Sequence, residues 1–344
     1  MASLGQSGKV TLVDVAKTLD PQGNTLDVAE LLNQSNEVLL DMPFYEANSV
    51  TGHLSGIRTG LPTAIWRQMY QGVPASKSVR ENVTDSLGML EARSEVDVEI
   101  AKLSNNLASF RLSEADSFIE AMNQTMAQAL FYGNTAVNPE QFMGLAPRFS
   151  AISGAANAQN VLSQAGAGAD NTSVWLVGWG QNTVFGIYPK GSKAGLEHQD
   201  LGEIDAFDAS NNRFRAYADL WKWKCGLVVK DWRYVVRICN IDVSDLIGST
   251  GSQNAQQLIK GMIASMANIP AMGRCTPVFY ANRTVKKMLS IQALDKSQNV
   301  LALQPGVQQL GTVAPGSVAQ GNVSLLGVPV RTVDRILNSE AVVA

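Results

Sequence analysis

The chain has 344 residues, a formal net charge of −3 and only 17% charged residues. This length predicts two or three folding units, and the chain lacks the overall basic charge of a protein whose main task is to coat nucleic acid. Because charges are few, much of the surface must be uncharged, which favours contact with other protein chains over isolation in solvent.

Three cysteines and the start of the sequence bear on the cellular compartment. Cys225, Cys239 and Cys275 are widely spaced and lack the Cys-x-x-Cys pattern of a zinc site, so we expect a reducing compartment, without a disulfide framework or a metal centre. The chain begins without a basic and apolar leader, and no run approaches the ~18 consecutive apolar residues of a membrane helix. We therefore expect no signal peptide, no membrane span and synthesis in the cytoplasm.

The first hundred residues are predicted to be extended. Residues 1–49 are polar, with one short helix expected at 26–32, and read as an arm that orders only against another surface. Residues 51–80 hold four basic side chains and no acid, whereas 81–99 hold six acids and one arginine. Alternating patterns predict strands at 64–70 and 95–100, with a turn at 72–74 between them.

These patterns predict a long two-stranded arm with a basic limb and an acidic limb. Isolated two-stranded ribbons are marginal in water, so an arm of this length needs another surface to hold it. An ordinary surface hairpin with solvated charges is the simpler interpretation of the same pattern.

The clearest helix is expected at residues 113–133. Ser113 followed by Asp116 matches a variant of the N-terminal capping box, and Gly133 supplies a residue that readily adopts positive φ just past the helix. Apolar residues at three- and four-residue spacing predict one buried face: Phe118, Ile119, Met122, Met126, Ala129 and Leu130.

The rest of the chain is predicted to be β-rich, with shorter helices. We expect a flexible loop at 150–170, strands at 174–179, 184–187, 278–280, 323–326 and 328–333, and a loop at 297–320, with Gly327 between the last two strands. Amphipathic helices are expected at 254–268 and at 284–294, the second with Val285, Met288, Leu289 and Ile291 inward.

Residues 213–238 combine aromatic and basic side chains. Trp221 and Trp223 alternate with Lys222 and Lys224, which places the two kinds on opposite faces of a strand. Because a surface that stacks single-stranded nucleic acid needs aromatic and basic groups together, a half-buried strand is the favoured interpretation over a nucleic-acid surface.

No pattern singles out a catalytic site. His53 and His198 belong to no triad or metal motif, and no phosphate-binding glycine loop opens a helix. Five carboxylates lie close together in sequence: Glu197, Asp200, Glu203, Asp205 and Asp208. An acidic loop in solvent, with or without a weakly held cation, is favoured over a carboxylate-dependent hydrolase because no spacing pairs two of them. We predict no enzyme activity and no catalytic, cofactor-binding or metal-binding residues.

Four local patterns carry a resemblance to a known family: LFYGN at 130–134, QFMGL at 141–145, PVFYANRTV at 277–285 and LLGVPV at 325–330. Together with the polar arm, the basic-then-acidic stretch and the long helix, they resemble the major capsid proteins of tailed double-stranded-DNA bacteriophages. The resemblance covers most of the chain through the order of its elements. It implies an α+β, Hong Kong 97-like capsid fold with an N-terminal arm, a two-stranded E-loop, a long spine helix, and peripheral and axial domains.

The resemblance also implies how the chain divides. The implied parts are an N-terminal arm at 1–49, an extended E-loop arm at 50–100, a peripheral domain with the spine helix at 101–165, an axial domain with additional peripheral-domain strands at 166–315, and a return to the peripheral domain at 316–344. The arm is too short for a large self-cleaving scaffold domain. Lys77 is the only lysine of the E-loop, and no partner for it is evident, so no covalent crosslink is expected.

The implied function is a non-catalytic shell protein that self-assembles as hexamers and pentamers into an icosahedral virion capsid. It would enclose double-stranded DNA, contacted non-specifically, with a separate scaffolding protein, a portal and a cement or decoration protein as partners, and without cofactor or membrane. The candidate subunit-interface residues are charged side chains of the extended stretch: Arg58, Arg67, Lys77, Arg80, Glu91 and Glu95.

Two other functions remain open on the sequence. An encapsulin-like nanocompartment would use the same fold to enclose enzyme cargo, and packaged DNA would distinguish the two kinds of shell. A β-rich, carboxylate-dependent hydrolase would instead lose turnover when one carboxylate is changed.

Overall fold

The computed structural model describes residues 34–344 apart from 104–105, 209, 248–250, 295–300 and 305–321. The helix expected at 26–32, most of the N-terminal arm and most of the loop expected at 297–320 lie outside this part of the chain. No helix in the described part is long and apolar enough to cross a membrane.

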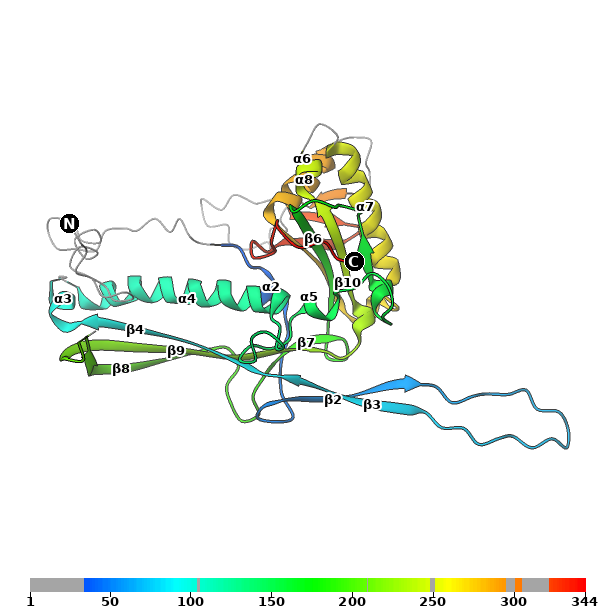
Figure 1. Ribbon diagram of the computed structural model, residues 1–344, viewed down its shortest axis with the longest axis horizontal. Coiled ribbons are helices and arrows are strands. Elements are labelled where there is room, and N and C mark those ends of the chain that lie inside the picture. The colour runs from blue at the N-terminus through cyan, green and yellow to red at the C-terminus, as the bar shows by residue number, and fades with distance from the viewer. Residues whose placement is uncertain (1–33, 104–105, 209, 248–250, 295–300, 305–321) are drawn as a thin grey trace, which may run out of the picture.

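The chain forms an elongated layer, a compact domain and a projecting arm (Figure 1). In the elongated layer, α4 (Leu107–Tyr132) lies along a ribbon of β4 (Gly88–Asp97), β8 (Leu196–Phe207) and β9 (Arg213–Val229). The compact domain stands at one end of this layer. The arm consists of β2 (Gly52–Gly60) and β3 (Val79–Ser86) and extends past the compact domain.

Helix α4 begins earlier than the sequence pattern predicts. Phe110 is buried against Val96 and Ala101, and the Arg111 guanidinium contacts the carboxylates of Asp219 at 2.8 Å and Asp200 at 2.9 Å. These contacts hold the first turns of the helix against the ribbon. The predicted start at Ser113 is therefore wrong, and its capping-box pattern lies inside the helix.

Helix α4 ends at the expected residue, but for a different reason. Gly133 is absent from the positive-φ residues. A Cβ atom at this position would instead lie 2.5 Å from the carbonyl oxygen of Phe142 and 2.6 Å from that of Ala129. The amide of Gly144 donates to the Gly133 carbonyl at 2.8 Å. Close approach of the returning chain, rather than a left-handed conformation, requires glycine here.

The buried face of α4 is narrower than predicted. Met122, Met126 and Leu130 are buried as expected, and the ring of Phe118 stacks on Trp221 with centroids 5.1 Å apart. Ile119 is 41% exposed, because the next residue along a helix is rotated by about 100° and leaves the stripe that faces the ribbon. The prediction that Ile119 is buried is wrong.

The ribbon contains two segments for which the sequence predicts a different structure. Strand β9 pairs with β4 from Ala216 to Cys225 and with β8 from Arg213 to Trp223. The predicted strand at 95–100 is therefore not the second limb of the arm: β4 ends at Asp97, and α3 (Val98–Lys102) follows. The expected acidic loop is strand β8. Trp221 is buried, as the alternation predicts.

The compact domain is organised around β6 (Asn171–Trp179), which is buried at every position. Strands β10 (Val235–Asp242) and β11 (Thr276–Ala281) flank it in antiparallel pairing. Strand β7 (Val184–Tyr188) pairs with β6 and with β9, so the sheet continues into the ribbon. The strands expected at 174–179, 184–187 and 278–280 are confirmed.

The edges of this sheet are made by short strands. They are β5 (Val161–Ser163) beside β10, and β14 (Val328–Thr332), β13 (Asn322–Leu325) and β12 (Leu301–Gln304) in succession beyond β11. The segment 150–170 is thus not a loop throughout. Leu326 and Gly327 both have positive φ in the two-residue turn before β14, as expected of a tight hairpin.

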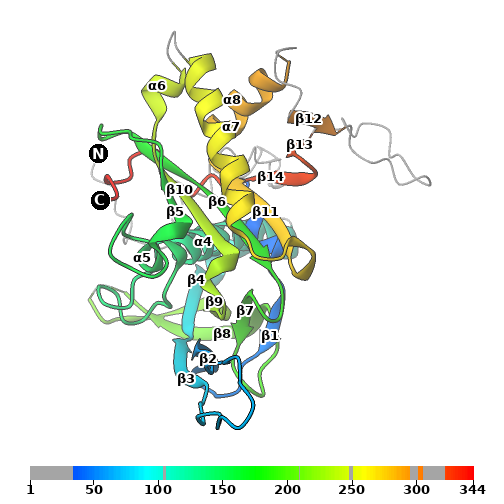
Figure 2. The ribbon, with the colours of Figure 1, turned by 90° about the vertical axis from the view of Figure 1, so that its right-hand side faces the viewer.

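Helices cover one face of the sheet (Figure 2). They are α6 (Val243–Ile247), α7 (Gly251–Asn268) and α8 (Arg283–Leu294), and Leu258, Met262, Val285 and Leu289 pack on this face as the periodicity predicts. Ile291 is 47% exposed, so its predicted inward position is wrong. The opposite face receives Leu130 and Phe131 from the end of α4.

A buried polar cluster attaches the C-terminal segment. The carboxylate of Glu340 contacts the Arg237 guanidinium at 2.8 Å, with both side chains almost fully buried, and accepts hydrogen bonds from the hydroxyls of Tyr132 and Ser173. Burial, and then the adjacent Glu340 carboxylate, raise the pKa of Tyr132.

The remaining short elements are α2 (Val38–Asp41), β1 (Phe44–Glu46), α5 (Leu145–Arg148) and the 3-10 turns Ala158–Asn160, Trp232–Tyr234 and Met272–Arg274.

Candidate intersubunit surfaces

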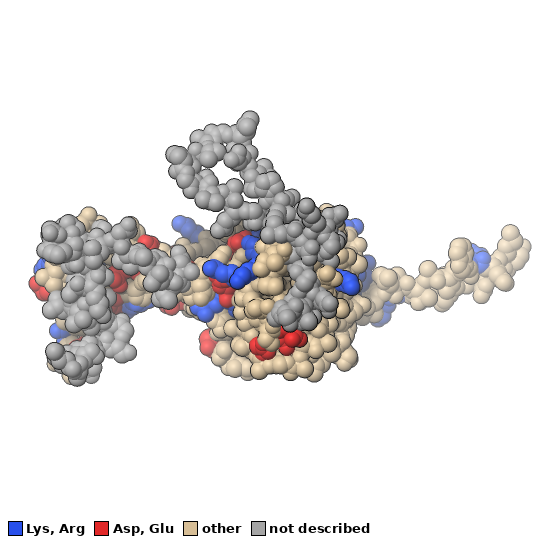
Figure 3. Space-filling model, turned by 90° about the horizontal axis from the view of Figure 1, so that it is seen from above, with Lys and Arg blue, Asp and Glu red and all other residues tan. Residues whose placement is uncertain are grey.

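The arm is a regular antiparallel hairpin only in the half nearest the body of the subunit. Register pairs run from Gly52 opposite Ser86 to Arg58 opposite Arg80. Beyond these strands the chain continues as an extended loop that reaches away from the body (Figures 1 and 3). The strand predicted at 64–70 is absent, because this segment has no partner strand within the described chain.

The tip of the arm, residues 61–77, exposes every residue to solvent. Trp66 is 99% exposed, Met69 90% and Tyr70 102%. Large apolar side chains that gather on an exposed surface are typical of sites that bind another protein. The tip therefore has the composition of a contact surface that the described part of its own subunit does not cover.

The root of the arm is anchored by a partly buried ion pair. Arg148 Nη2 lies 2.7 Å from Asp85 Oδ1 and also donates to the carbonyl oxygens of Met143 and Leu227. Asp85 is 4% exposed. His53 lies opposite Asp85 in the hairpin register. Nothing in the sequence near residue 85 or 148 signals this anchor, because its two partners lie 63 residues apart.

The six predicted interface residues fall into two groups. Arg58, Arg67, Lys77 and Arg80 all lie on the arm, and none of them makes an ion pair within the described part of the chain. Glu91 and Glu95 lie on β4 in the ribbon.

Both carboxylates have partners in their own subunit. Glu91 lies 3.2 Å from Lys222, and Glu95 lies 3.0 Å from Arg93. The structure thus separates these two acids from the arm, whereas Glu81 and Asp85 lie on β3 of the hairpin. The expectation that the acidic limb of the hairpin extends over 81–99 is therefore wrong beyond the end of β3.

The carboxylates of β8 are held by neighbouring groups. Arg111 donates to Asp200, and Arg215 and Tyr217 donate to Glu203; these hydrogen bonds lower the pKa of both acids. Asp208 accepts from the backbone of its own turn. Among the residues that the structure describes, no group of three or more His, Cys, Asp and Glu is placed to hold a metal ion.

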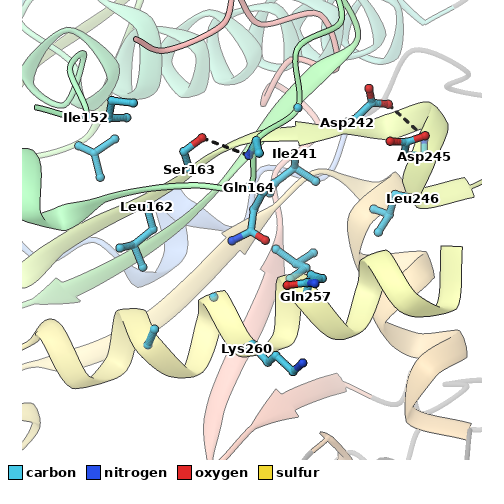
Figure 4. Close-up of a pocket in the computed structure, with 16 residues that line it drawn as sticks. Ile152, Leu162, Ser163, Gln164, Ile241, Asp242, Asp245, Leu246, Gln257 and Lys260 are labelled. Carbon is cyan, nitrogen blue, oxygen red and sulfur yellow. Dashed lines mark hydrogen bonds between the residues drawn. The ribbon is translucent and has the colours of Figure 1, made fainter. Parts of the chain in front are cut away.

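A cavity of about 870 Å³ lies between β5 and α7 (Figure 4). Its walls mix apolar side chains such as Leu162 and Leu246 with Gln164 and Gln257. Asp242 Oδ1 accepts from the backbone amide of Asp245 at 3.0 Å, which lowers the pKa of Asp242. This carboxylate therefore caps the start of α6.

Comparisons with known proteins show which family and which solved structure this chain is similar to. A family model described as major capsid protein GP7 matches residues 20–344. Among solved structures, the chain is similar to the near-atomic structure of bacteriophage epsilon15, with 34% identity and a TM-score of 0.73 over 100% of this chain and 99% of that chain. No curated protein sequence matches.

Two further structures are more distant. The capsid of a native GTA particle has 10% identity and a TM-score of 0.46 over 65% of this chain and 96% of that chain. An encapsulin complex from Synechococcus elongatus PCC 7942 has 11% identity and a TM-score of 0.44 over 67% of this chain and 95% of that chain.

The epsilon15 match extends over the whole chain, so the expected α+β, Hong Kong 97-like capsid fold is confirmed. The match to a capsid-protein family gives the chain a structural, shell-forming role in a virion capsid, with subunits that self-assemble into capsomers. The chain therefore belongs to the family of the tailed-phage major capsid protein GP7.

Proposed function

We propose that this chain forms hexamers and pentamers that close into an icosahedral shell around double-stranded DNA, with the arm of each subunit lying on a neighbour. The observation that carries the proposal is the tip at residues 61–77, which is exposed throughout and carries Trp66, Met69 and Tyr70. Apolar area of this kind is unfavourable in water, and burying it on another subunit would stabilise the assembly.

The geometry of the arm suits a shell. An arm that extends from one side of a subunit makes a head-to-tail contact, in which different surfaces of the two subunits meet. Contacts of this type close into rings when the rotation between subunits is a whole fraction of a turn. A projecting arm can therefore make the repeated contact that capsomer rings need.

The charged residues of the arm support the same contact. Arg58 and Arg80 lie directly opposite each other in the hairpin, where like charges are mutually unfavourable. A neighbour's carboxylates would offset this repulsion and fix the register of the contact. We therefore propose Arg58, Arg67, Lys77 and Arg80 as interface residues, with Glu91 and Glu95 as candidate acceptors on the body of a neighbour.

The proposed partners follow from a DNA-filled shell. A separate scaffolding protein, a portal and a cement or decoration protein would contribute to assembly, the subunit would be made in the cytoplasm of a bacterial host, and it would have no enzyme activity. Because the net charge is −3, any non-specific contact with DNA would depend on local basic side chains rather than on an overall basic surface.

The test compares the full chain with a variant in which a short glycine–serine turn replaces residues 61–77. Negative-stain microscopy should show closed shells for the full chain, whereas the variant should remain folded by circular dichroism but unassembled. A control, Leu326→Ser, removes an exposed apolar side chain from the β13–β14 turn and should still assemble. Shells formed by the variant without the tip would contradict the proposed role of the arm.

The contents of the particle decide between a genome and a cargo. Particles from producing cells should contain double-stranded DNA that resists nuclease until the shell is opened. Particles filled with an enzyme and free of DNA would contradict the proposal and favour a nanocompartment.

A further inference from the structure

A small apolar groove lies between α4 and β4, at the opposite end of the arm from its tip. Met89, Leu90, Met126, Ala129 and Phe142 line it, and its volume is about 120 Å³. Met89 is 60% exposed at the mouth, whereas Met126 and Phe142 are buried in the floor. The groove has the scale of one large side chain rather than of a strand or a helix.

Tight packing gives the groove a fixed floor. A Cβ atom on Gly88 would lie 3.2 Å from the ring of Phe142 and 3.4 Å from the carbonyl oxygen of Glu140, so the segment 140–142 is seated directly on the start of β4. Glu140 stands on the rim of the groove, is exposed and makes no ion pair within the described part of the chain. The groove therefore combines an apolar floor, two methionines and one unpaired carboxylate.

The tip of the arm has the complementary composition. Trp66 is the largest apolar side chain of the tip and is 99% exposed. Arg67 follows it directly and has no carboxylate partner in the described chain. Methionine sulfur makes favourable contacts with aromatic rings and adapts to their shape, and an arginine beside the inserted ring could reach a carboxylate on the rim.

The tip cannot reach the groove of its own subunit. Gly88 follows the end of β3 at the root of the arm. Strand β3 alone places roughly 25 Å between root and loop, at about 3.3 Å per residue, and the loop then continues in the same direction (Figure 1). A Trp66–Arg67 tip that enters this groove must therefore belong to a second copy.

We infer that Trp66 of one subunit inserts into the groove between α4 and β4 of a second copy, with Arg67 paired to Glu140 of that copy. The inference rests on the proposed function and names the receptor for the arm. Each subunit offers one tip and one groove on different surfaces, so the contact is head-to-tail and can repeat around a ring.

The first test exchanges the two charges. Arg67→Glu and Glu140→Arg each bring like charges together, and each should lose shells while keeping a folded subunit. The double variant Arg67→Glu/Glu140→Arg restores opposite charges and should recover shells. The matched control, Arg67→Glu with Glu197→Arg, changes an exposed acid of β8 and should not recover them. Normal assembly by both single variants, or no recovery by the double variant, would overturn the inference.

The second test measures proximity in assembled shells and leaves Trp66 in place. Oxidation of the Ile65→Cys/Thr125→Cys variant should give covalent multimers on a denaturing gel, because Thr125 lines the groove and residue 65 is next to the inserted ring. The control pair Ile65→Cys/Leu326→Cys should stay monomeric. Equal crosslinking in the two variants would place the tip elsewhere.

The two proposals fail in different ways. Shells formed without residues 61–77 would refute the role of the arm itself. Loss of shells in that variant, together with no recovery on charge exchange, would refute only the groove as the receptor.

Discussion

Asp85 and Arg148 join the arm to the body through a contact that is shielded from solvent. Their atoms lie 2.7 Å apart, and the side chains are 4% and 18% exposed. His53 stands opposite Asp85 and packs edge-on against the ring of Phe185. Asp85 Oδ2 and His53 Nδ1 are buried without a hydrogen-bond partner. The root of the arm is thus a largely buried polar contact, in contrast to the exposed apolar tip.

Removing one partner of this ion pair should destabilise the subunit strongly. Arg148→Met leaves the Asp85 carboxylate buried and uncompensated, which typically costs about 3–5 kcal/mol. The double variant Asp85→Leu/Arg148→Met removes both charges and should be less destabilised than Arg148→Met alone. Thermal unfolding of unassembled subunits measures both effects. Arg93→Ala, at the surface pair with Glu95, should cost at most about 1 kcal/mol; an equal cost at both sites would contradict the buried anchor.

His53 should make stability depend on pH. Burial lowers its pKa below 6.5, although Asp85 acts in the opposite direction. The unfolded chain therefore binds the proton at a higher pH than the folded chain, and the free energy of unfolding should fall as the pH drops below 6.5 toward the folded pKa. Denaturant unfolding of the wild type and of His53→Asn, from about pH 7.5 to about pH 5, tests this. Parallel pH profiles would show that His53 contributes nothing.

Among the elements, those with local periodic patterns could be predicted from the sequence. Helices α4, α7 and α8 and strands β6, β7 and β9 appear where spacing places their apolar residues, because each buries a face that the periodicity defines. The end of α4 was found at Gly133 for the wrong reason. Its start was missed because Phe110 and Arg111 are held by contacts with residues far away in the sequence.

A charge on the inner stripe of α4 should prevent folding. Met126 is 3% exposed in the main core, so Met126→Asp buries an unpaired carboxylate at a cost of several kcal/mol, against a total stability of about 5–15 kcal/mol. Gln128→Asp lies on the exposed face and should be mild. Gln124 is not a suitable control, because its side-chain amide forms hydrogen bonds with Glu120 and Arg335. Equal solubility and helix content of the two variants would mean that the faces are assigned wrongly.

Strand partnership could not be predicted in the same way. Residues 95–97 were assigned to the arm because they alternate and follow it in sequence, yet β4 pairs with β9, more than a hundred residues further on. The acidic segment that forms β8 likewise reads as a loop in the sequence. This strand is exposed along most of its length, so it carries no alternation of apolar residues that would predict a strand. Of the candidate interface, the basic residues were placed on the arm, whereas the groove, the anchor at Arg148 and the positions of Glu91 and Glu95 depend on packing between distant segments.

The whole molecule combines a well-packed body with an arm that its own subunit does not cover. The body has cores on both faces of the sheet. The tip at residues 61–77 touches none of these cores and exposes all of its residues. Such a division is expected of a subunit that gains part of its structure from neighbours.

Hydrogen exchange tests whether neighbouring subunits cover the tip of the arm, because it compares the same amides in unassembled subunits and in closed shells. We expect amides of residues 61–77 to exchange freely in the subunit and to become protected in the shell, since assembly covers them. Amides of β4, which pair with β9 inside the subunit, should be equally protected in both states and serve as the internal control. Equal exchange of residues 61–77 in subunits and shells would contradict the claim that the arm is a contact between subunits.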